Sequence, residues 1–145
     1  MPAAFVTTRR VEFSDTDAAG IMHFAAFFRL MEQAEHELLR SVGLSVVMPG
    51  KSGKISWPRV SAKCDYQSPA RFEELLEIEV RIARLGKRSV TYQHRFSRSG
   101  NVLATGEITA VCCRVREGMP PKSMDIPAAI LKKLQAFVMP PSPAS

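Results

Sequence analysis

The 145-residue sequence has few cysteines, and no spacing ties them together. There are three: Cys112 and Cys113 are adjacent, Cys64 is distant, and no C-x-x-C pair occurs. Zinc sites and dithiol redox sites need paired cysteines at short spacing, so we predict no metal and no redox cofactor. An odd number of cysteines is also atypical of a secreted protein stapled by disulfides. We expect all three thiols to pack in a hydrophobic core.

Long apolar runs are missing as well. The first residues, MPAAFVTTRR, lack the apolar segment of a signal peptide, and no run approaches the roughly 18 residues that a membrane span needs. We therefore predict a cytoplasmic protein with no membrane partner. With 46% hydrophobic and 23% charged residues, the chain has the composition of one globular domain. We place this domain at residues 1–138, followed by a flexible Pro/Ser-rich tail at 139–145.

Charge is unbalanced but not clustered. Twenty basic and fourteen acidic side chains give a formal net charge of +6, which favours an anionic partner. No block of five or six like charges occurs, and the cations are spread along the chain. Because nucleic-acid sites usually gather their cations into a patch, we predict no nucleic-acid partner.

The strongest periodic pattern is helical. Apolar residues recur every three to four positions from Phe24 to Val42, and Gly43 follows as a natural C-terminal stop. The apolar positions are Phe24, Phe27, Phe28, Met31, Ala34, Leu38 and Val42. A stripe of this width must be buried, so the pattern predicts one long helix packed on another layer.

The remaining patterns alternate with a period of two, as half-buried strands do. The predicted strands are Phe5–Phe13, Val60–Tyr66, Leu76–Ile82, Val90–Phe96 and, after a hairpin turn at Ser99–Asn101, Val102–Arg116. A weaker helical pattern at Ile130–Val138 closes the chain, with Pro127 near its first turn. One strand, one helix and an antiparallel meander predict an α+β fold in which a sheet wraps around a long central helix.

Chemically capable residues gather just before that helix, in the sequence FSDTDAAGIMHF at 13–24. A loop that enters a helix presents unpaired N–H groups and the positive end of the helix dipole, which suits an anion or an oxyanion. Gly20 allows a tight turn. Asp15 and Asp17 fit either catalysis or the capping of a turn, and His23 fits a metal ligand, a base or a packed surface residue.

In these residues the sequence resembles the hotdog-fold acyl-CoA thioesterases related to 4-hydroxybenzoyl-CoA thioesterase. The similar segments follow in order along most of the chain: R-V-E-F at 10–13, D-T-D-A-A-G-I at 15–21, Phe28, Arg29, Glu32, Ala34, C-D-Y at 64–66, P-A-R-F at 69–72, L-E-I-E-V at 76–80 and G-K-R-S at 86–89.

The resemblance implies a role for several residues. Asp17 would attack the thioester carbonyl as a nucleophile or activate a water, the backbone amide near Phe24 would bind the oxyanion, and Gly20 would shape the loop. No metal or redox cofactor would be required. Many members of a neighbouring subgroup carry histidine seven residues after the aspartate, whereas His23 is the sixth. His23 is therefore a candidate for the chemistry, for the acyl pocket or for an interface.

The resemblance also implies partners. Lys87 and Arg88 match a basic stretch that binds the phosphates of CoA in relatives, although a solvated turn would carry the same residues. Glu32 matches an acidic position that we expect to be structural. Relatives join their sheets edge to edge and build each active site between two subunits, which predicts a homodimer or a homotetramer.

The function predicted from the sequence is hydrolysis of an acyl-CoA to a free acid and CoA. One alternative is an acyl group carried by acyl carrier protein, whose acidic surface also suits a chain of charge +6. Another is a non-catalytic acyl-CoA-binding module, because a fold alone does not determine function. The identity of the acyl group is not predicted.

Overall fold

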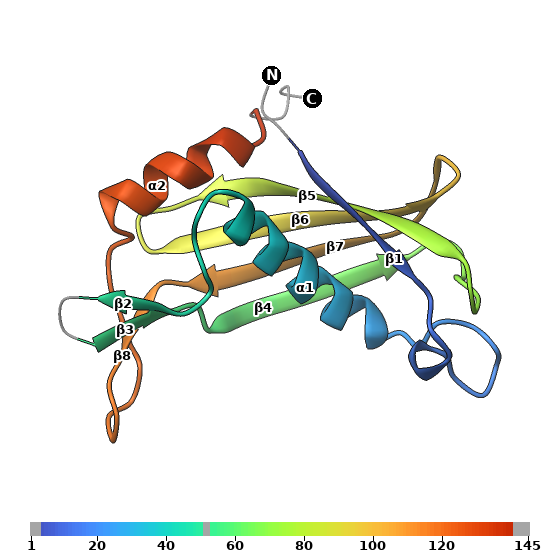
Figure 1. Ribbon diagram of the computed structural model, residues 1–145, viewed down its shortest axis with the longest axis horizontal. Helices are drawn as coiled ribbons and strands as arrows, with labels where there is room; N and C mark the ends of the chain where they lie inside the picture. The colour runs from blue at the N-terminus through green and yellow to red at the C-terminus, as the bar shows by residue number, and fades with distance from the viewer. Residues whose placement is uncertain (1–3, 51–52, 141–145) are drawn as a thin grey trace.

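The computed structural model describes residues 4–50 and 53–140 and consists of a five-stranded antiparallel sheet, a helix across one of its faces and a small second sheet (Figure 1). In chain order the elements are β1 (Phe5–Arg10), the 3₁₀ helix η1 (Phe13–Asp15), α1 (Ala26–Ser41), β2 (Met48–Gly50), β3 (Gly53–Ser56), β4 (Arg59–Tyr66), β5 (Leu75–Leu85), β6 (Ser89–Arg98), β7 (Asn101–Val111), β8 (Cys113–Val115), β9 (Lys122–Ser123), α2 (Ala128–Leu134) and the 3₁₀ helix η2 (Gln135–Phe137). The predicted tail lies outside the described residues from 141 onward.

The large sheet has the strand order β1-β5-β6-β7-β4. Strands β5, β6 and β7 form the predicted meander, and Ser99 and Gly100 make the β6–β7 turn with φ of 49° and 82°, as a two-residue hairpin requires. β4 precedes β5 in the chain, but it lies beside β7, at the edge of the sheet opposite β1. The connection at 67–74 therefore spans the width of the sheet at one end, which is where the loop between β1 and α1 lies (Figure 1).

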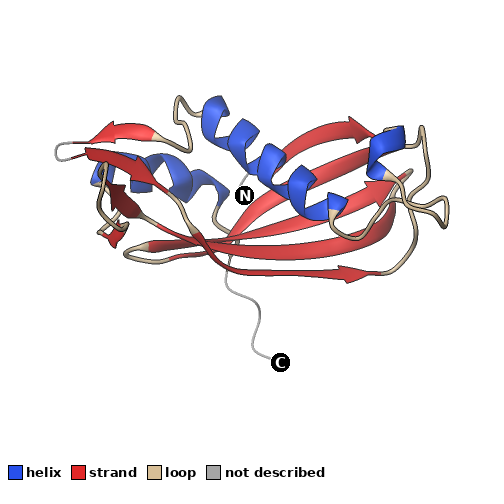
Figure 2. Cartoon of the chain, turned by 90° about the horizontal axis from the view of Figure 1, so that it is seen from below, coloured by secondary structure: helices blue, strands red, loops and turns tan. Residues whose placement is uncertain are grey.

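Helix α1 lies along one face of the large sheet (Figure 2). Its buried residues are Ala26, Phe27, Leu30, Met31, Ala34, Glu35, Leu38 and Leu39. The helix is shorter than predicted at both ends: Phe24 stands outside it with 63% of its surface exposed, and Val42 is its C-terminal cap. Gly43 ends the helix as predicted, with a φ of +80°.

The predicted core faces of two strands are confirmed, since Leu76, Ile78, Val80 and Ile82 of β5 and Val90, Tyr92, His94 and Phe96 of β6 are all buried. β4 differs from the prediction. Val60 is 63% exposed and Tyr66 45% exposed, although the alternation of β4 predicted a buried face. There are two reasons. The register of β4 shifts between Arg59 and Ser61, which takes Val60 out of the alternation, and β4 is an edge strand that α1 covers only in part within one chain.

Three other predicted boundaries are wrong. The first strand ends at Arg10, because η1 begins at Phe13. The predicted strand Val102–Arg116 is two strands that are interrupted at Cys112. The N–H of Cys112 donates to the carbonyl of Arg88 (2.7 Å), and the carbonyl of Cys112 accepts from the N–H of Met124 (2.9 Å). β8 then joins the small sheet β2-β3-β8-β9, of which β2 and β3 were not predicted. At the other end of the chain, α2 ends at Leu134 and continues as η2.

Burial of the cysteines follows the prediction in two cases of three. Cys112 and Cys113 are buried and Cys64 is half-buried, all as free thiols. Burial raises the pKa of the Cys112 thiol to about 11, which keeps it neutral and unreactive at neutral pH. Among the described residues, no helix is long and apolar enough to cross a membrane.

A buried charged group links α1 to two strands. Glu35, 1% exposed, lies with Oε2 at 2.7 Å from Nε2 of His94 on β6 and with Oε1 at 2.7 Å from a guanidinium nitrogen of Arg59 on β4. His94 is fully buried, and its Nδ1 has no partner among the described residues. A buried carboxylate is tolerated only when it is paired and hydrogen-bonded, so these contacts fix α1 across the sheet.

Replacing Glu35 should therefore be costly, because Glu35→Ala leaves the Arg59 cation without its partner and a buried imidazole without its acceptor. We expect a loss of about 3–5 kcal/mol in the free energy of unfolding, measured by urea denaturation. Glu32 is exposed on the same helix, so Glu32→Ala is the matched control and should change stability by less than about 0.5 kcal/mol. Equal losses in the two variants would contradict the role given to Glu35.

Candidate active site

The loop between β1 and α1 is folded back on itself around Asp17. The amide of Asp17 donates to the carbonyl of Ile21 (2.9 Å), and the amide of Gly20 donates to the carbonyl of Asp17 (3.0 Å). Gly20 has a φ of +78°, a conformation that side chains rarely adopt. Oδ1 of Asp17 accepts from the amide of Ala19 (2.8 Å), which holds the carboxylate in place. Oδ2 receives no hydrogen bond from the described residues.

The connection between β4 and β5 closes the site from the other side. The amide of Met22 donates to the carbonyl of Ala70 (2.7 Å), and Ile21 and Arg71 form an antiparallel bridge. Because Ala70 is fully buried, this contact fixes the two loops together. Segments some fifty residues apart in the chain thus share one end of the sheet.

Between these loops and the start of α1 lies a cavity of ≈ 380 Å³. The residues that line it are Asp17, Ile21, Met22, Phe24, Phe27, Tyr66, Gln67, Ser68 and Pro69. Among these lining residues Asp17 alone carries a charge, and most of the others are apolar or aromatic. The arrangement places a carboxylate with one uncommitted oxygen at the wall of an apolar cavity.

Asp15 makes different contacts from Asp17, although both belong to the D-T-D sequence. Oδ2 of Asp15 accepts from the amide of Glu12 (2.9 Å), and Oδ1 lies 3.6 Å from the guanidinium of Arg29. The carbonyl of Asp15 also accepts from the amide of His23 (2.7 Å). Asp15 does not line the cavity, and its carboxylate caps the turn of η1, which is the structural alternative considered for it from the sequence.

His23 and Phe24 form the turn that leads into α1. The amide of Ala26 donates to the His23 carbonyl (2.9 Å), and the amide of Ala25 donates to Nδ1 of the His23 ring (3.1 Å). The exposed imidazole stacks on the Phe24 ring, with centroids 4.6 Å apart, and does not line the cavity. Within the described residues the amide N–H of Phe24 has no acceptor, so it is available to a ligand.

Tyr66 is a site residue that the sequence analysis did not identify as one, because its strand position suggested a part in the fold. Its hydroxyl donates to the carbonyl of Phe24 (2.8 Å), and its ring packs edge-on against Phe27 with centroids 5.2 Å apart. The one available signal was the C-D-Y sequence at 64–66, which is part of the family resemblance. No spacing rule predicts that β4 ends beside the start of α1.

Lys87 and Arg88 belong to the turn between β5 and β6, and this turn lies at the other end of the sheet from the loop between β1 and α1 (Figure 1). They follow β5, whose 11 residues span about 33 Å, whereas the loop with Asp17 adjoins the start of that strand. Both cations contact Asp125, at 3.8 Å from Lys87 and 2.8 Å from Arg88. The hydrogen bond from Arg88, helped by the charge of Lys87, lowers the pKa of the Asp125 carboxyl. Within one chain, this pair and Asp17 are not brought together.

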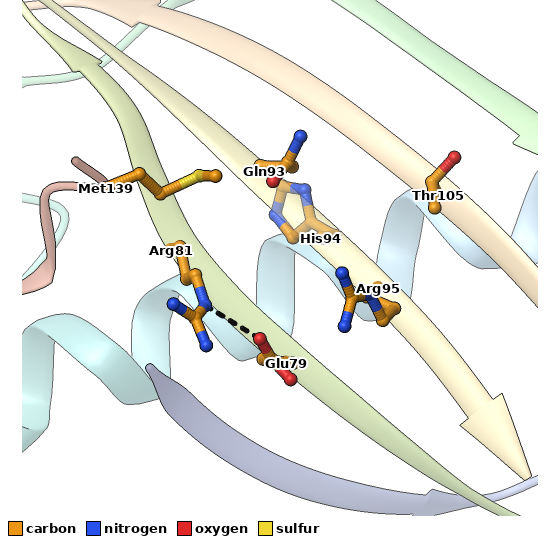
Figure 3. Close-up of a pocket in the computed structure, with 7 residues that line it drawn as sticks. All are labelled: Glu79, Arg81, Gln93, His94, Arg95, Thr105 and Met139. Atoms are coloured by element: carbon orange, nitrogen blue, oxygen red, sulfur yellow. Dashed lines mark hydrogen bonds and ion pairs between the residues drawn. The ribbon is translucent and has the colours of Figure 1, made fainter. Parts of the chain in front are cut away.

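Several further cavities lie away from Asp17, and two of them bear on the residues named here. One, of ≈ 800 Å³, adjoins the cation pair, since Asp125 lines it together with Lys54 and Arg114. The other, of ≈ 260 Å³, lies on the face of the sheet opposite α1, where Glu79 and Arg81 form an ion pair at 2.7 Å (Figure 3). In the residues described, no cluster of three His, Cys, Asp or Glu side chains could hold a metal ion.

Comparison with known proteins identifies the family of the chain. The family model described as the thioesterase-like superfamily matches residues 11–134. A 1,4-dihydroxy-2-naphthoyl-CoA hydrolase from Synechococcus sp. (strain WH7803) is 33% identical over 111 residues, covering 72% of this chain and 72% of the relative. A second relative of that name, from Synechococcus elongatus, is 29% identical and covers 81% of this chain and 90% of its own length.

Solved structures agree as well. A gentisyl-coenzyme A thioesterase is 29% identical, with a TM-score of 0.76 over 89% of this chain and 98% of the other. A 1,4-dihydroxy-2-naphthoyl-CoA thioesterase from Synechocystis, 23% identical, has the same fold with a TM-score of 0.79 over 92% of this chain and 96% of its own. With a family model that matches most of its length and a fold shared with these enzymes, the chain belongs to the thioesterase-like superfamily of hotdog proteins.

Proposed function

We propose that the protein hydrolyses the thioester of an acyl-CoA that carries an aromatic acyl group, and releases the free acid and CoA. The observation that carries this proposal is that Asp17 and Phe24 line the same apolar cavity, and that the N–H of Phe24 has no acceptor among the described residues. A thioester carbonyl placed between them would meet a carboxylate on one side and a hydrogen-bond donor on the other. Ester-type hydrolysis needs these two groups and no redox chemistry.

The chemistry follows from the roles of the two groups. The Asp17 carboxylate either attacks the carbonyl carbon directly or removes a proton from the water that attacks it. In both routes negative charge builds on the carbonyl oxygen, and the Phe24 N–H stabilises it at the positive end of α1. The C–S bond then breaks and CoA leaves as a thiolate, which takes up a proton. In the direct route a water molecule then hydrolyses the mixed anhydride formed with Asp17, which releases the free acid and restores the carboxylate. A carboxylate is a modest nucleophile, so much of the rate comes from positioning.

An aromatic acyl group is supported by the cavity and by the relatives. Phe24, Phe27 and Tyr66 supply three rings to a cavity of ≈ 380 Å³, and such rings favour stacked or edge-on contact with another ring. Relatives 29–33% identical are named for 1,4-dihydroxy-2-naphthoyl-CoA and gentisyl-CoA, both aromatic thioesters. Acyl carrier protein as the alternative carrier has no comparable observation in its favour.

We further propose that the working unit is a homodimer joined through β4. This edge strand exposes backbone groups that can pair with another strand, and Val60 and Ala62 expose apolar surface beside them. Pairing β4 with β4 of a second copy would extend the sheet across both chains and cover that surface. Assembly of two such dimers into a homotetramer stays a prediction, as do the cytoplasmic location and the lack of a cofactor.

An antiparallel β4 pair would also give Lys87 and Arg88 a substrate to bind. Two-fold symmetry reverses the second chain, so the end of its sheet that carries Lys87 and Arg88 would adjoin the end that carries Asp17 in the first. The cations would then meet the phosphates of a CoA whose thioester reaches the partner's cavity. This arrangement makes each site depend on two chains.

The first test is Asp17→Asn, which removes the nucleophile or base at almost constant volume. We expect kcat for aromatic acyl-CoA thioesters to fall at least about a hundredfold, with the fold intact by circular dichroism. Asp15→Asn is the matched control, because it makes the same change two residues away, and it should retain most activity. Turnover by a folded Asp17→Asn variant near that of the wild type would contradict the mechanism.

The second test concerns the cation pair. Lys87→Ala/Arg88→Ala should raise KM for an acyl-CoA several-fold while leaving kcat within about twofold, because distant phosphate contacts stabilise the ground and transition states alike. The effect should shrink with added salt. Arg40→Ala/Arg95→Ala removes two exposed cations that lie away from β4 and controls for net charge. An unchanged KM would mean that the nucleotide binds elsewhere.

The third test concerns the proposed interface. Val60→Lys places a charge on β4 and should convert the dimer into a less active monomer, as measured by light scattering at micromolar concentration. Val6, 48% exposed on the opposite edge strand β1, provides the control Val6→Lys, which should stay dimeric. A wild-type protein that is monomeric and fully active would refute the shared site.

A further inference from the structure

The peptide bond between Phe24 and Ala25 is held at both of its polar atoms by side chains. Its carbonyl oxygen accepts from the Tyr66 hydroxyl (2.8 Å), and its N–H donates to Nδ1 of His23 (3.1 Å). α1 has no side-chain cap at its own N-terminal cap position, Ala25. These two contacts therefore take the place of a cap, one residue before the helix begins.

We propose that Tyr66 and His23 are positioning residues for the oxyanion site, which they serve by fixing the Phe24–Ala25 peptide and hence the orientation of the Phe24 N–H. This inference rests on the hydrolytic function proposed above and adds to it the part played by two side chains. His23 then acts through its acceptor nitrogen and transfers no proton.

The surroundings of Tyr66 support a fixed hydroxyl. Its ring packs edge-on against Phe27, which in turn packs against the fully buried Phe96 with centroids 5.1 Å apart. This row of rings connects the site to the core of the sheet. Although the residue is 45% exposed, its partial desolvation and the neighbouring Cys64 thiol raise the pKa of Tyr66 to about 12. The hydroxyl consequently keeps its proton, and remains a donor, at any ordinary assay pH.

His23 is arranged in the complementary way. Its ring stacks on Phe24, and its Nδ1 must lack a proton in order to accept from Ala25. A side chain that accepts a hydrogen bond from the backbone N–H two residues later in the sequence has the geometry of an Asx turn, which asparagine forms readily. Asparagine at position 23 can thus replace the acceptor but cannot act as an acid or a base.

The experiment compares four single variants and one double variant. Tyr66→Phe and His23→Leu should each lower kcat about tenfold with KM changed less than twofold, and His23→Asn should recover most of the loss. Because both side chains hold one peptide, the double variant Tyr66→Phe/His23→Leu should lose much less than a hundredfold. Tyr92→Phe removes the only other tyrosine hydroxyl and should leave kcat unchanged. Thermal unfolding confirms that each variant is folded.

A second measurement does not depend on activity. Amide hydrogen exchange by NMR should be faster at Ala25 in His23→Leu and in Tyr66→Phe than in the wild type, and close to the wild type in His23→Asn. A folded Tyr66→Phe variant with unchanged kcat and exchange would overturn the inference. His23→Asn as impaired as His23→Leu would make His23 a proton carrier instead. If the wild type hydrolyses no thioester, the proposed function fails, while exchange at Ala25 still decides whether the two side chains hold this peptide.

Discussion

The packing of α1 on the large sheet is the constraint on which the site depends. Eight residues of the helix are buried, and Glu35 adds a charged contact to His94 and Arg59 that only one placement of the helix satisfies. Gly106 of β7 shows how close this packing is, because a Cβ there would stand 2.2 Å from the Cε of Met31. Once the helix axis is set, the position of its N-terminus beside the end of β4 follows.

The placement of α1 also explains why the groups proposed for catalysis lie at its start and not along it. The apolar face of the helix is occupied by the core, and its other face is exposed. Only the N-terminus combines unpaired backbone N–H groups with access to a cavity. The loops at 11–25 and 67–74 close around this point through backbone hydrogen bonds, so Asp17 is held by main-chain geometry as much as by its own side chain.

One chain does not bring together all the groups that the proposed function assigns to the binding of a CoA ester. Asp17 lies at one end of the sheet, and Lys87 and Arg88, with the ≈ 800 Å³ cavity beside Asp125, lie at the other. The uncovered apolar residues of β4 lie between these two ends. A thioesterase whose catalytic group and nucleotide-binding cations come from different chains would be active only when assembled. The proposed dimer would bring these two groups to one substrate.

The sequence by itself determined the main helix, most strands of the large sheet and the family. Alternation in β5 and β6, the helical stripe and the D-T-D-A-A-G loop are local patterns, and local patterns survive in any tertiary context that buries them. Three features were decided only by the tertiary structure. First, β4 pairs with β7 at a sheet edge, so part of its apolar face is exposed. Second, the two aspartates of the D-T-D sequence differ, because the carboxylate of Asp15 contacts Glu12 and Arg29. Third, the hydroxyl of Tyr66 contacts the carbonyl of Phe24, 42 residues away in the sequence. The pairing of β4 with β7, the contact of Asp15 with Arg29 and the contact of Tyr66 with Phe24 join segments that are distant in the sequence, and the free energy that selects them comes from packing that no local pattern encodes.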